Sequence, residues 1–189
     1  MVLKNIYLIH IALVVSLSSC ENSHDLSKQF SCETNSKLRN TETVNDFNKS
    51  FSVEVPKHWN TKLYYDSLQS EIFSADTLKS LSESYIMDFA MIHAPLDLNE
   101  SLRKKVHQKS MENLMETTQE SFHTFQGYSA YAHLGKGTSR GSDFRVFQYY
   151  IKTSEESYMM IKTEFYGSEN FESRFCEALD LIDRIQINK

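Results

Sequence analysis

The sequence predicts an α+β fold in which an antiparallel sheet of about six strands packs against two helices, in the order βββ-α-βββ-α. Short runs that alternate apolar and polar residues occur in two sets, and a segment with helical periodicity follows each set. A polar loop of hairpin length, residues 153–157, joins the last two runs and makes them antiparallel neighbours. In a fold of this class the helices pack on the sheet and form one core with it.

The first strand set is predicted at residues 51–55, 62–74 and 85–92, where apolar and polar residues alternate. Pro56 ends the first of these strands, because proline cannot donate a hydrogen bond to a central ladder. Trp59 follows shortly after and is expected to anchor the packing of this region.

A helix is predicted from Asp97 to about Thr118. Asp97 and Glu100 stand three residues apart, as in a capping box that satisfies free N–H groups at a helix start. The apolar stripe of this segment shifts midway, which predicts a bend or burial on two sides. The two groups of apolar residues, nearly opposite each other, are Leu98, Leu102 and Val106, and Met111, Leu114 and Met115.

The second strand set begins at Gly127 and continues through residues 144–152 and 158–166. The first of these strands is expected to run through Leu134, and Gly135-Lys136-Gly137-Thr138 with Gly141 is predicted to form the turn before the next. The final helix is expected to start with Ser168 as its N-cap and to end near Ile185. The apolar face of this helix consists of Phe171, Phe175, Ala178, Leu179, Ile182 and Ile185.

The first twenty residues have the pattern of a bacterial lipoprotein signal peptide. Lys4 precedes a mostly apolar run over residues 6–17, and Leu17-Ser18-Ser19-Cys20 is a lipobox. We expect removal of residues 1–19 and attachment of lipid to the Cys20 sulfur, which holds the mature chain on a membrane. The apolar run is too short for a retained membrane-spanning helix. The alternative is a plain secretory signal with an incidental cysteine, although an A-x-A-like cleavage site is absent.

Residues 20–46 are predicted to be a flexible tether and residues 47–189 a single domain. The tether is rich in Ser, Asn, Thr, Lys and Glu and has too few apolar residues for a periodic stripe. Lipidation of Cys20 leaves Cys32 and Cys176 as an even pair in an exported chain. A disulfide between them could join the tether to the last helix, and two free thiols fit the sequence equally well.

The charge of the chain argues against nucleic-acid binding. It has 20 basic and 25 acidic residues, a net charge of −5, and no block of like charge. The first predicted helix has a basic side, which could meet anionic lipid headgroups or an acidic partner. A solvated face is the simpler interpretation, because glutamates nearby offset the charge. The basic residues are Arg103, Lys104, Lys105 and Lys109.

The sequence carries no catalytic or metal-binding signature. Its histidines are spread along the domain without the H-x-x-x-H or C-x-x-C spacing of metal sites. The Gly135-Lys136-Gly137-Thr138 segment lacks the spacing of a phosphate-binding loop. We therefore predict no catalytic residues, no metal ligands and no cofactor. Folding could still bring His58, His93 or His133 together with a carboxylate such as Asp88. The histidines of the domain are His58, His93, His107, His123 and His133.

Two pairs of adjacent tyrosines could line a ligand groove. Neighbouring residues of a strand face opposite sides, so one ring of each pair could lie on the outer face of the sheet. The commoner arrangement places one ring of each pair in the core and exposes the other to solvent. The pairs are Tyr64 with Tyr65 and Tyr149 with Tyr150.

Three features of the domain have counterparts in a known family. They are Phe51-Ser52-Val53-Glu54-Val55-Pro56 followed by Trp59, the Gly127-Tyr128-Ser129-Ala130 start of the second strand set, and a final helix running into Ile185-Gln186-Ile187. On these features residues 47–188 resemble the PsbP-like superfamily, which includes DcrB-type lipoproteins. The resemblance implies the α+β architecture and a non-catalytic binding module, and it carries over no catalytic residues.

Together these observations predict a lipid-anchored protein of the bacterial cell envelope that faces the periplasm or the exterior. Its expected partners are the membrane, through the N-terminal lipid, and an unknown envelope protein or small ligand, but not nucleic acid. Two alternatives stay open. One is a metal-assisted hydrolase with converging histidines and carboxylates, and the other is a structural spacer of the envelope.

Overall fold

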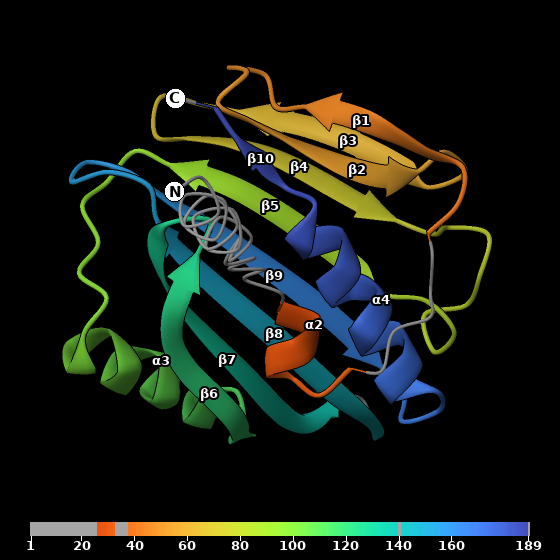
Figure 1. Ribbon diagram of the computed structural model, residues 1–189. Helices are drawn as coiled ribbons and strands as arrows, with labels where there is room; N and C mark the ends of the chain where they lie inside the picture. The colour runs from red at the N-terminus through yellow and green to blue at the C-terminus, as the bar shows by residue number, and fades with distance from the viewer. Residues whose placement is uncertain (1–25, 33–37, 140, 189) are drawn as a thin grey trace, which may run out of the picture.

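The computed structural model describes residues 26–32, 38–139 and 141–188. The predicted signal peptide and Cys20 lie outside these residues. Figure 1 shows the arrangement of the helices and strands. In chain order they are α2 (Leu26–Gln29), β1 (Thr41–Asn45), β2 (Phe51–Pro56), β3 (Asn60–Tyr65), β4 (Gln69–Ala75), β5 (Ile86–Ile92), α3 (Glu100–Glu112), β6 (Met115–Phe125), β7 (Tyr128–Ser139), β8 (Ser142–Lys152), β9 (Tyr158–Tyr166), α4 (Phe171–Asp183) and β10 (Gln186–Ile187).

The strands form two antiparallel sheets, and the predicted α+β class is confirmed. The large sheet has seven strands in the order β3-β4-β5-β9-β8-β7-β6, and the small sheet has the order β1-β2-β10. The expected antiparallel pair β8–β9 is present in the register Tyr149 to Ile161. The expected count of about six strands was too low, because β1, β6 and β10 are short or polar and β3 and β4 were taken as one.

The helices α3 and α4 pack on opposite faces of the large sheet. Tyr149 and Tyr150 are adjacent on β8 and therefore point to opposite sides. Tyr149 belongs to the large core beneath α4, whereas Tyr150 packs in a smaller cluster with Val106 of α3. In Figure 1, α4 lies across the large sheet, and α3 lies beside β6 and β7.

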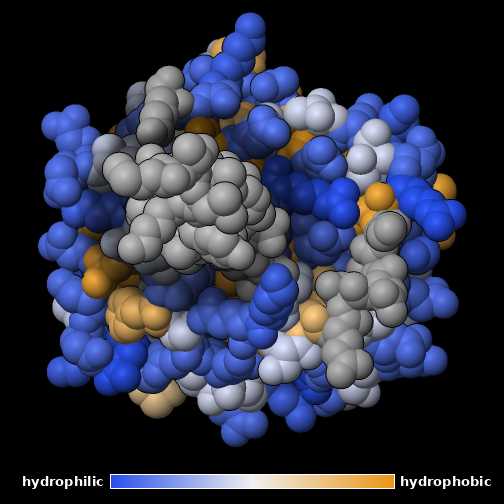
Figure 2. Space-filling model, in the orientation of Figure 1, coloured by the Kyte–Doolittle hydropathy of each residue, from blue (hydrophilic) through white to orange (hydrophobic). Residues whose placement is uncertain are grey.

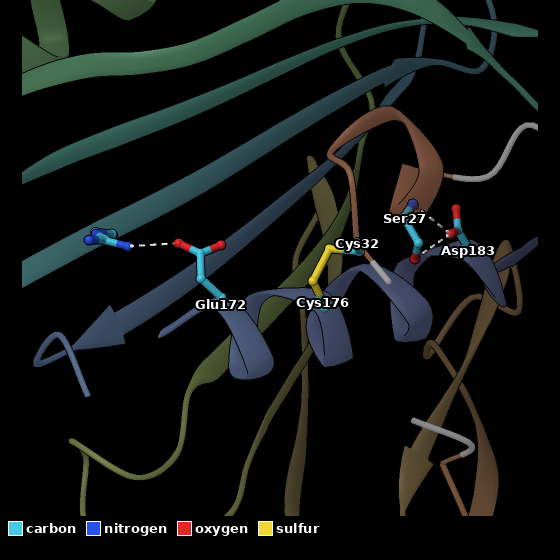
Figure 3. Close-up of a disulfide and its surroundings, with 6 residues drawn as sticks. Ser27, Cys32, Glu172, Cys176 and Asp183 are labelled. Atoms are coloured by element: carbon cyan, nitrogen blue, oxygen red, sulfur yellow. Dashed lines mark hydrogen bonds and ion pairs between the residues drawn. A yellow bond between two sulfur atoms is a disulfide. The ribbon is translucent and has the colours of Figure 1, made fainter. Parts of the chain in front are cut away.

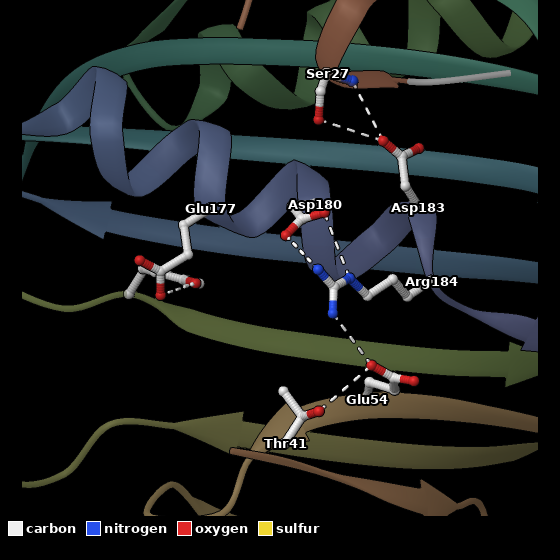
Figure 4. Close-up of polar contacts among 8 residues, drawn as sticks. Ser27, Thr41, Glu54, Glu177, Asp180, Asp183 and Arg184 are labelled. Carbon is white, nitrogen blue, oxygen red and sulfur yellow. Dashed lines mark hydrogen bonds and ion pairs between the residues drawn. The ribbon is translucent and has the colours of Figure 1, made fainter. Parts of the chain in front are cut away.

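The predicted apolar face of the last helix is confirmed, since all six of its residues are buried in the large core. The helix starts two residues later than expected. Its N-cap is Asn170, in a left-handed conformation without a side-chain capping bond, rather than Ser168. At the other end, Arg184 pairs with Asp180 at 2.9 Å and with Glu54 of β2 at 3.3 Å, which joins α4 to the small sheet (Figure 4).

The segment 62–74, predicted as one strand, is a hairpin of β3 and β4. The chain reverses at Asp66, whose Oδ1 accepts hydrogen bonds from the backbone N–H groups of Leu68 at 2.7 Å and Gln69 at 2.9 Å. Such a side-chain-to-backbone turn needs neither glycine nor proline, which is why the alternating pattern concealed it.

The first long helix ends at Glu112, and its predicted extension to Thr118 was wrong. Its N-cap is Asn99 rather than Asp97. Leu114 takes a left-handed conformation, with φ of 57°, and leads the chain directly into β6. The shift of the apolar stripe was therefore the end of the helix and not a bend.

Of the predicted turn, Gly135-Lys136-Gly137-Thr138 lies instead in the C-terminal part of β7, whereas Gly141, with φ of 82°, does lie where the chain reverses between Ser139 and Ser142. A Cβ atom on Gly137 would lie only 2.7 Å from the backbone oxygen of Leu114. Glycine is thus required here because another backbone segment passes very close, as is common for a glycine inside a strand.

Much of the predicted tether belongs to the folded domain, so the tether prediction was wrong for residues 26–32 and 38–46. Leu26 and Phe30 are buried in the large core, and β1 pairs with β2. The buried Asp46 accepts a hydrogen bond from the backbone N–H of Phe51 at 2.9 Å. A few apolar residues docking singly onto a formed core leave no periodic pattern in the sequence.

A disulfide joins Cys32 to Cys176 of α4, with the two sulfur atoms 2.04 Å apart (Figure 3). Beside it, the Asp183 carboxylate accepts hydrogen bonds from the backbone of Leu26 at 3.0 Å and of Ser27 at 3.3 Å. The short helix α2 is therefore held on α4 by a covalent bond, polar contacts and apolar packing together.

Hydrophilic residues predominate on the face shown in Figure 2, and the hydrophobic residues there form small separate patches. Among the described residues, no helix has both the length and the apolar character that crossing a membrane requires.

Candidate functional site

A groove lies between the C-terminal end of α3 and the outer face of the large sheet, which is the face opposite α4. Its volume is about 320 Å³, within the range of small-molecule sites. Polar groups and apolar side chains contribute similar shares of its lining. The lining residues are Lys109, Ser110, Asn113, Met115, His133, Thr138, Ser139, Phe144, Val146, Gln148, Lys162 and Glu164.

The groove forms where α3 gives way to β6. Asn113 caps the helix, and the left-handed Leu114 turns the chain toward β7. Gly135 and Gly137 of β7 let the start of β6 approach, because a Cβ on Gly135 would lie 3.1 Å from the Met115 side chain. These two glycines bring no side chain into the space between helix and sheet.

The floor of the groove continues a polar row that crosses the sheet. His133 of β7 stands opposite Gln148 of β8, Gln148 opposite Lys162 of β9, and Lys162 opposite Asp88 of β5. Residues paired in this way point to the same face of a sheet. The three strand pairings thus place four polar side chains side by side on the outer face.

His133 is the most unusual member of the row, because its side chain is polar and only 1% exposed. Its Nε2 lies 2.9 Å from the Thr117 hydroxyl, while its Nδ1 is buried without a hydrogen-bond partner. Burial, and secondly the nearby His107, lower the pKa of His133 to about 4. The imidazole is therefore neutral at pH 7, with one nitrogen whose hydrogen bond is unmade, a costly arrangement in a folded protein.

The charges of the groove floor largely neutralise each other. The Lys162 ammonium donates to the Glu164 carboxylate, which also accepts a hydrogen bond from the Tyr166 hydroxyl at 2.9 Å. On the helix side, the Lys109 ammonium lies 3.6 Å from the exposed Glu112 carboxylate. Groups that both donate and accept therefore surround a space without strong net charge.

Asp88, at the end of the row, is a second polar group with an unmade hydrogen bond. Its Oδ1 is buried without a partner. Burial, and next the neighbouring Glu71 carboxylate, raise the pKa of Asp88 to about 7, against the opposing effect of Lys162. A carboxyl group that is partly protonated at neutral pH can donate or accept a hydrogen bond.

A partly exposed network of polar side chains holds α3 above the sheet. The Glu120 carboxylate of β6 accepts hydrogen bonds from the Tyr131 hydroxyl at 2.7 Å and lies 2.7 Å from His107 Nε2. Arg103 adds an ion pair to the same carboxylate at 3.7 Å. Burial raises the pKa of Glu120, but the hydrogen bonds of Tyr131 and His107 outweigh it and leave the pKa lowered. The carboxylate is thus charged and keeps both elements in place.

The structure does not bring the predicted histidines together with Asp88 into a metal site. His58 pairs with Asp76 at 3.3 Å, and His123 Nε2 lies 2.7 Å from the Tyr149 hydroxyl. Within residues 26–32, 38–139 and 141–188, no group of three His, Cys, Asp or Glu side chains could hold a metal ion.

The four tyrosines considered for a ligand groove lie apart. Tyr149 and Tyr150 are both buried, on opposite faces of the sheet. Tyr64 and Tyr65 are both exposed on β3, where Tyr65 stacks on Phe47 with ring centres 3.8 Å apart. The expected arrangement, one wetted ring in each pair, was wrong because burial follows the position of the strand in the sheet.

The basic side of α3 is exposed to solvent, and neighbouring glutamates form ion pairs with two of its basic residues. Arg103 pairs with Glu100 at 2.7 Å, and Lys109 with Glu112 at 3.6 Å. Lys104 and Lys105 are exposed.

Sequence reasoning named His133 as a histidine of interest but missed the groove, since no motif marks it. The signal that could have indicated it was the pair of glycines inside a strand.

Comparisons with solved structures identify the fold. No family model and no curated protein sequence matches the chain. Cyanobacterial PsbP from Synechocystis matches with a TM-score of 0.53 at 9% identity, over 82% of this chain and 96% of that one. The Ran-binding protein Mog1p of Saccharomyces cerevisiae matches with a TM-score of 0.51 at 13% identity, over 78% of this chain and 95% of that one.

A Pseudomonas aeruginosa protein of unknown function, described as a putative regulator, matches with a TM-score of 0.52 at 8% identity, over 79% of this chain and 98% of that one. These matches cover most of each chain. The protein therefore shares the fold of these three proteins, which is the architecture that the sequence resemblance implied. Identities this low show a shared fold, and fold alone does not determine function.

Proposed function

We propose that this protein is a lipid-anchored component of the bacterial cell envelope whose PsbP-like domain binds a small polar ligand and catalyses no reaction. The lipobox ending at Cys20 supports the anchor, and the groove beneath α3 supports the binding role. The observation that carries the proposal is the buried Nδ1 of His133, which has no hydrogen-bond partner among the residues that the structure describes. A ligand in the groove that reaches this nitrogen would form the hydrogen bond that the nitrogen lacks, and binding is favoured by that amount.

The ligand is expected to be uncharged or zwitterionic and rich in hydrogen-bonding groups. The lysine and glutamate on the groove floor already pair with each other. A ligand with strong net charge would have to compete with this pair, whereas hydroxyl or amide groups can bond to Gln148 and Ser110 beside it. Phe144 and Val146 supply an apolar wall for its carbon skeleton.

A blocked groove tests the binding role. Ser139 of β7 lines the groove and lies an even number of residues from His133, so it shares the groove face of the strand, and Ser139→Trp is expected to cover the groove without disturbing the core. Thr124→Trp, on an exposed site of β6 away from the groove, is the matched control. The native protein is purified from its own membranes, and bound small molecules are identified by mass spectrometry. We expect the wild type and the control to carry a bound ligand that Ser139→Trp has lost. A ligand that all three retain contradicts the proposal, as does turnover of that ligand.

The anchor is tested separately. Mass spectrometry of the native protein is expected to show a chain that starts at an acylated Cys20, and Cys20→Ala is expected to move the protein out of the membrane fraction. An unprocessed Met1 with a free thiol at position 20 contradicts this part of the proposal.

Binding of an envelope protein is a second candidate function, supported by the free edge of the large sheet. Among the described residues, β3 pairs only with β4, and its Leu63, Tyr64 and Tyr65 are 45%, 50% and 59% exposed. An apolar edge strand is the surface to which an extended segment of a partner adds a strand. A photoreactive residue at position 63 is expected to crosslink one partner in intact cells, and one at position 104 on α3 is not. Equal crosslinking at both positions contradicts this role.

A further inference from the structure

A second cavity lies on the other face of the large sheet, where α4 begins. Its volume is about 220 Å³. The residues around it come from α2's C-terminal side, from β6, β7 and β8, and from the first turns of α4. They are Phe30, Thr118, Gln119, Leu134, Lys136, Arg145, Phe171, Glu172 and Phe175.

Two positively charged residues lie side by side in the wall of this cavity. Lys136 of β7 stands directly opposite Arg145 of β8 in the strand register. Like charges at directly opposed positions of a sheet destabilise the fold. On its other side Lys136 stands opposite Glu116 of β6, but Glu116 is exposed, and among the described residues no carboxylate lies within ion-pair distance of the Lys136 ammonium.

The acidic group that pairs with Arg145 offers little compensation. The Glu172 carboxylate lies 3.8 Å from the Arg145 guanidinium, and its side chain is 86% exposed (Figure 3). An ion pair so open to water contributes little. The Arg145 guanidinium also lies 3.7 Å above the Phe171 ring, which fixes its position beside the cavity without neutralising it.

A third cation strengthens the positive potential in this region. Arg174 of α4 is buried and binds backbone carbonyls, including those of Ser84 at 2.7 Å and Gly167 at 2.9 Å, rather than a carboxylate. Burial, and secondly the charge of Arg145, lower the pKa of Arg174. The positive charge near the start of α4 is thus strong enough to act on a neighbouring cation.

The rest of the cavity wall is aromatic. Phe171 and Phe175 stack with ring centres 5.3 Å apart, and Phe30 meets Phe175 edge-on at 5.5 Å. A cavity of about 150 Å³ is large enough to bind benzene. The present cavity therefore has room for one ring or a short chain together with a carboxylate.

We propose that this cavity binds a small organic carboxylate, either aromatic or with a short aliphatic chain. The carboxylate lies between Lys136 and Arg145, and its carbon body packs against Phe30 and Phe175. The opposed cations, a cost to the folded protein alone, become partners of the anion when it binds. This site is separate from the groove beneath α3 and stands independently of the function proposed for that groove.

Three probes of equal size and different charge test the proposal by isothermal titration calorimetry on the full chain. Benzoate is expected to bind at least tenfold more tightly than benzyl alcohol, and benzylammonium is expected not to bind. Because the attraction is electrostatic, benzoate affinity is expected to fall as salt is raised. Equal affinity for benzoate and benzyl alcohol overturns the proposal, as does binding of benzylammonium.

The variant Lys136→Gln separates a binding role from a structural one. Benzoate affinity is expected to fall about tenfold, while the melting temperature is expected to rise, because the variant removes one of two opposed like charges. Lys62→Gln, at an exposed position of β3, is the matched control and is expected to change neither quantity. Unchanged benzoate affinity in Lys136→Gln contradicts the site. A lower melting temperature contradicts the assignment of Lys136 as an uncompensated charge.

Discussion

The two faces of the large sheet differ in what fills them. Under α4, the buried side chains are almost all apolar or aromatic, and α2, the small sheet and a disulfide close the space. Under α3, the buried apolar cluster contains only Val106, Tyr131 and Tyr150, and a polar row with two unsatisfied atoms runs beside it. One face therefore supplies most of the stability of the domain. The other carries the row of four polar side chains beside the groove. Buried polar atoms without a partner among the described residues occur on both faces, at His133 and Asp88 on this one and at Ser70, Thr163 and Arg174 on the α4 side.

This difference explains how a small domain can carry a binding site. Unsatisfied buried groups such as His133 Nδ1 and Asp88 Oδ1 lower the stability of the fold. A domain tolerates such groups only when other contacts contribute enough stabilising free energy to offset them, and the core under α4 contributes most of it. Each of the following experiments tests one side of this comparison, starting with the largest expected effect.

Loss of the disulfide is expected to have the largest effect. The bond connects residues 144 positions apart, and closing a loop of this length stabilises a fold by about 4–5 kcal/mol on the loop-entropy model. The double variant Cys32→Ser with Cys176→Ser is expected to lose about this much in urea denaturation, and the reduced wild type is the control that should match it. A loss below about 1 kcal/mol means that α4 does not depend on the bond.

Truncation of a core ring compares the two faces directly. Phe147 is fully buried under α4, and Phe147→Ala is expected to cost about 3–5 kcal/mol in the free energy of unfolding. Val106→Ala under α3 removes fewer atoms from a smaller cluster, so it is expected to cost less per deleted carbon. Urea denaturation measures both. Equal costs per deleted carbon contradict the claim that the α4 face carries the greater share of stability.

Asp88 makes the α3 face sensitive to pH. The unfolded chain releases the Asp88 proton near pH 4, whereas the folded chain releases it at about pH 7. Between these values the folded state binds more protons, so this group lowers the free energy of unfolding as pH rises. Asp88→Asn is expected to match the wild type at pH 4 and to be more stable at pH 8. The exposed Asp97→Asn is the control, and an Asp88→Asn variant without a gain at pH 8 contradicts the account.

His133 is expected to act with the opposite sign. Its pKa is about 4 in the folded state and about 6.5 in the unfolded state, so the unfolded state binds more protons between these values. This group therefore raises the free energy of unfolding as pH rises from about 4 to 6.5. An NMR titration of the imidazole is expected to show a midpoint near 4, with the exposed His93 as the reference resonance in the same sample. A His133 midpoint near 6.5 contradicts its burial.

Leu114 is expected to show the smallest effect. A residue with a Cβ in the left-handed region, such as Leu114, destabilises the folded state by about 1–2 kcal/mol. Glycine removes this strain, but it also raises the entropy of the unfolded chain, which lowers stability by about 0.4–1 kcal/mol. Leu114→Gly is therefore expected to gain about 0.5 kcal/mol, measured by urea denaturation. Leu78 is similarly exposed but lies outside the left-handed region, so Leu78→Gly should lose stability. A loss in Leu114→Gly contradicts the assignment of strain to this turn.

The sequence was sufficient for those elements that have a strong local pattern. The strands around Val53, Phe89 and Ile161 alternate clearly, and the apolar face of α4 has helical spacing. The strand β6 was missed because its polar residues, such as Thr117 and Glu120, give it no alternating apolar pattern. Residues 26–32 were taken for a tether because their burial depends on a disulfide partner far along the chain.

The groove could not be predicted because it depends on register between distant strands. The row from His133 to Asp88 requires three correct strand pairings that join residues up to about 75 positions apart. Local composition contains no information on such pairings. The close approach of β6 to Gly137 is likewise a contact across the fold, and in the sequence it looked like a turn.

The central claim is that the groove on the α3 face binds a small ligand. It is tested most directly by a crystal structure of the lipidated protein purified from its own membranes. We expect density for a small molecule in the groove, with a polar atom within hydrogen-bond distance of His133 Nδ1. A groove that holds only water, with His133 Nδ1 still lacking a partner, would contradict the account.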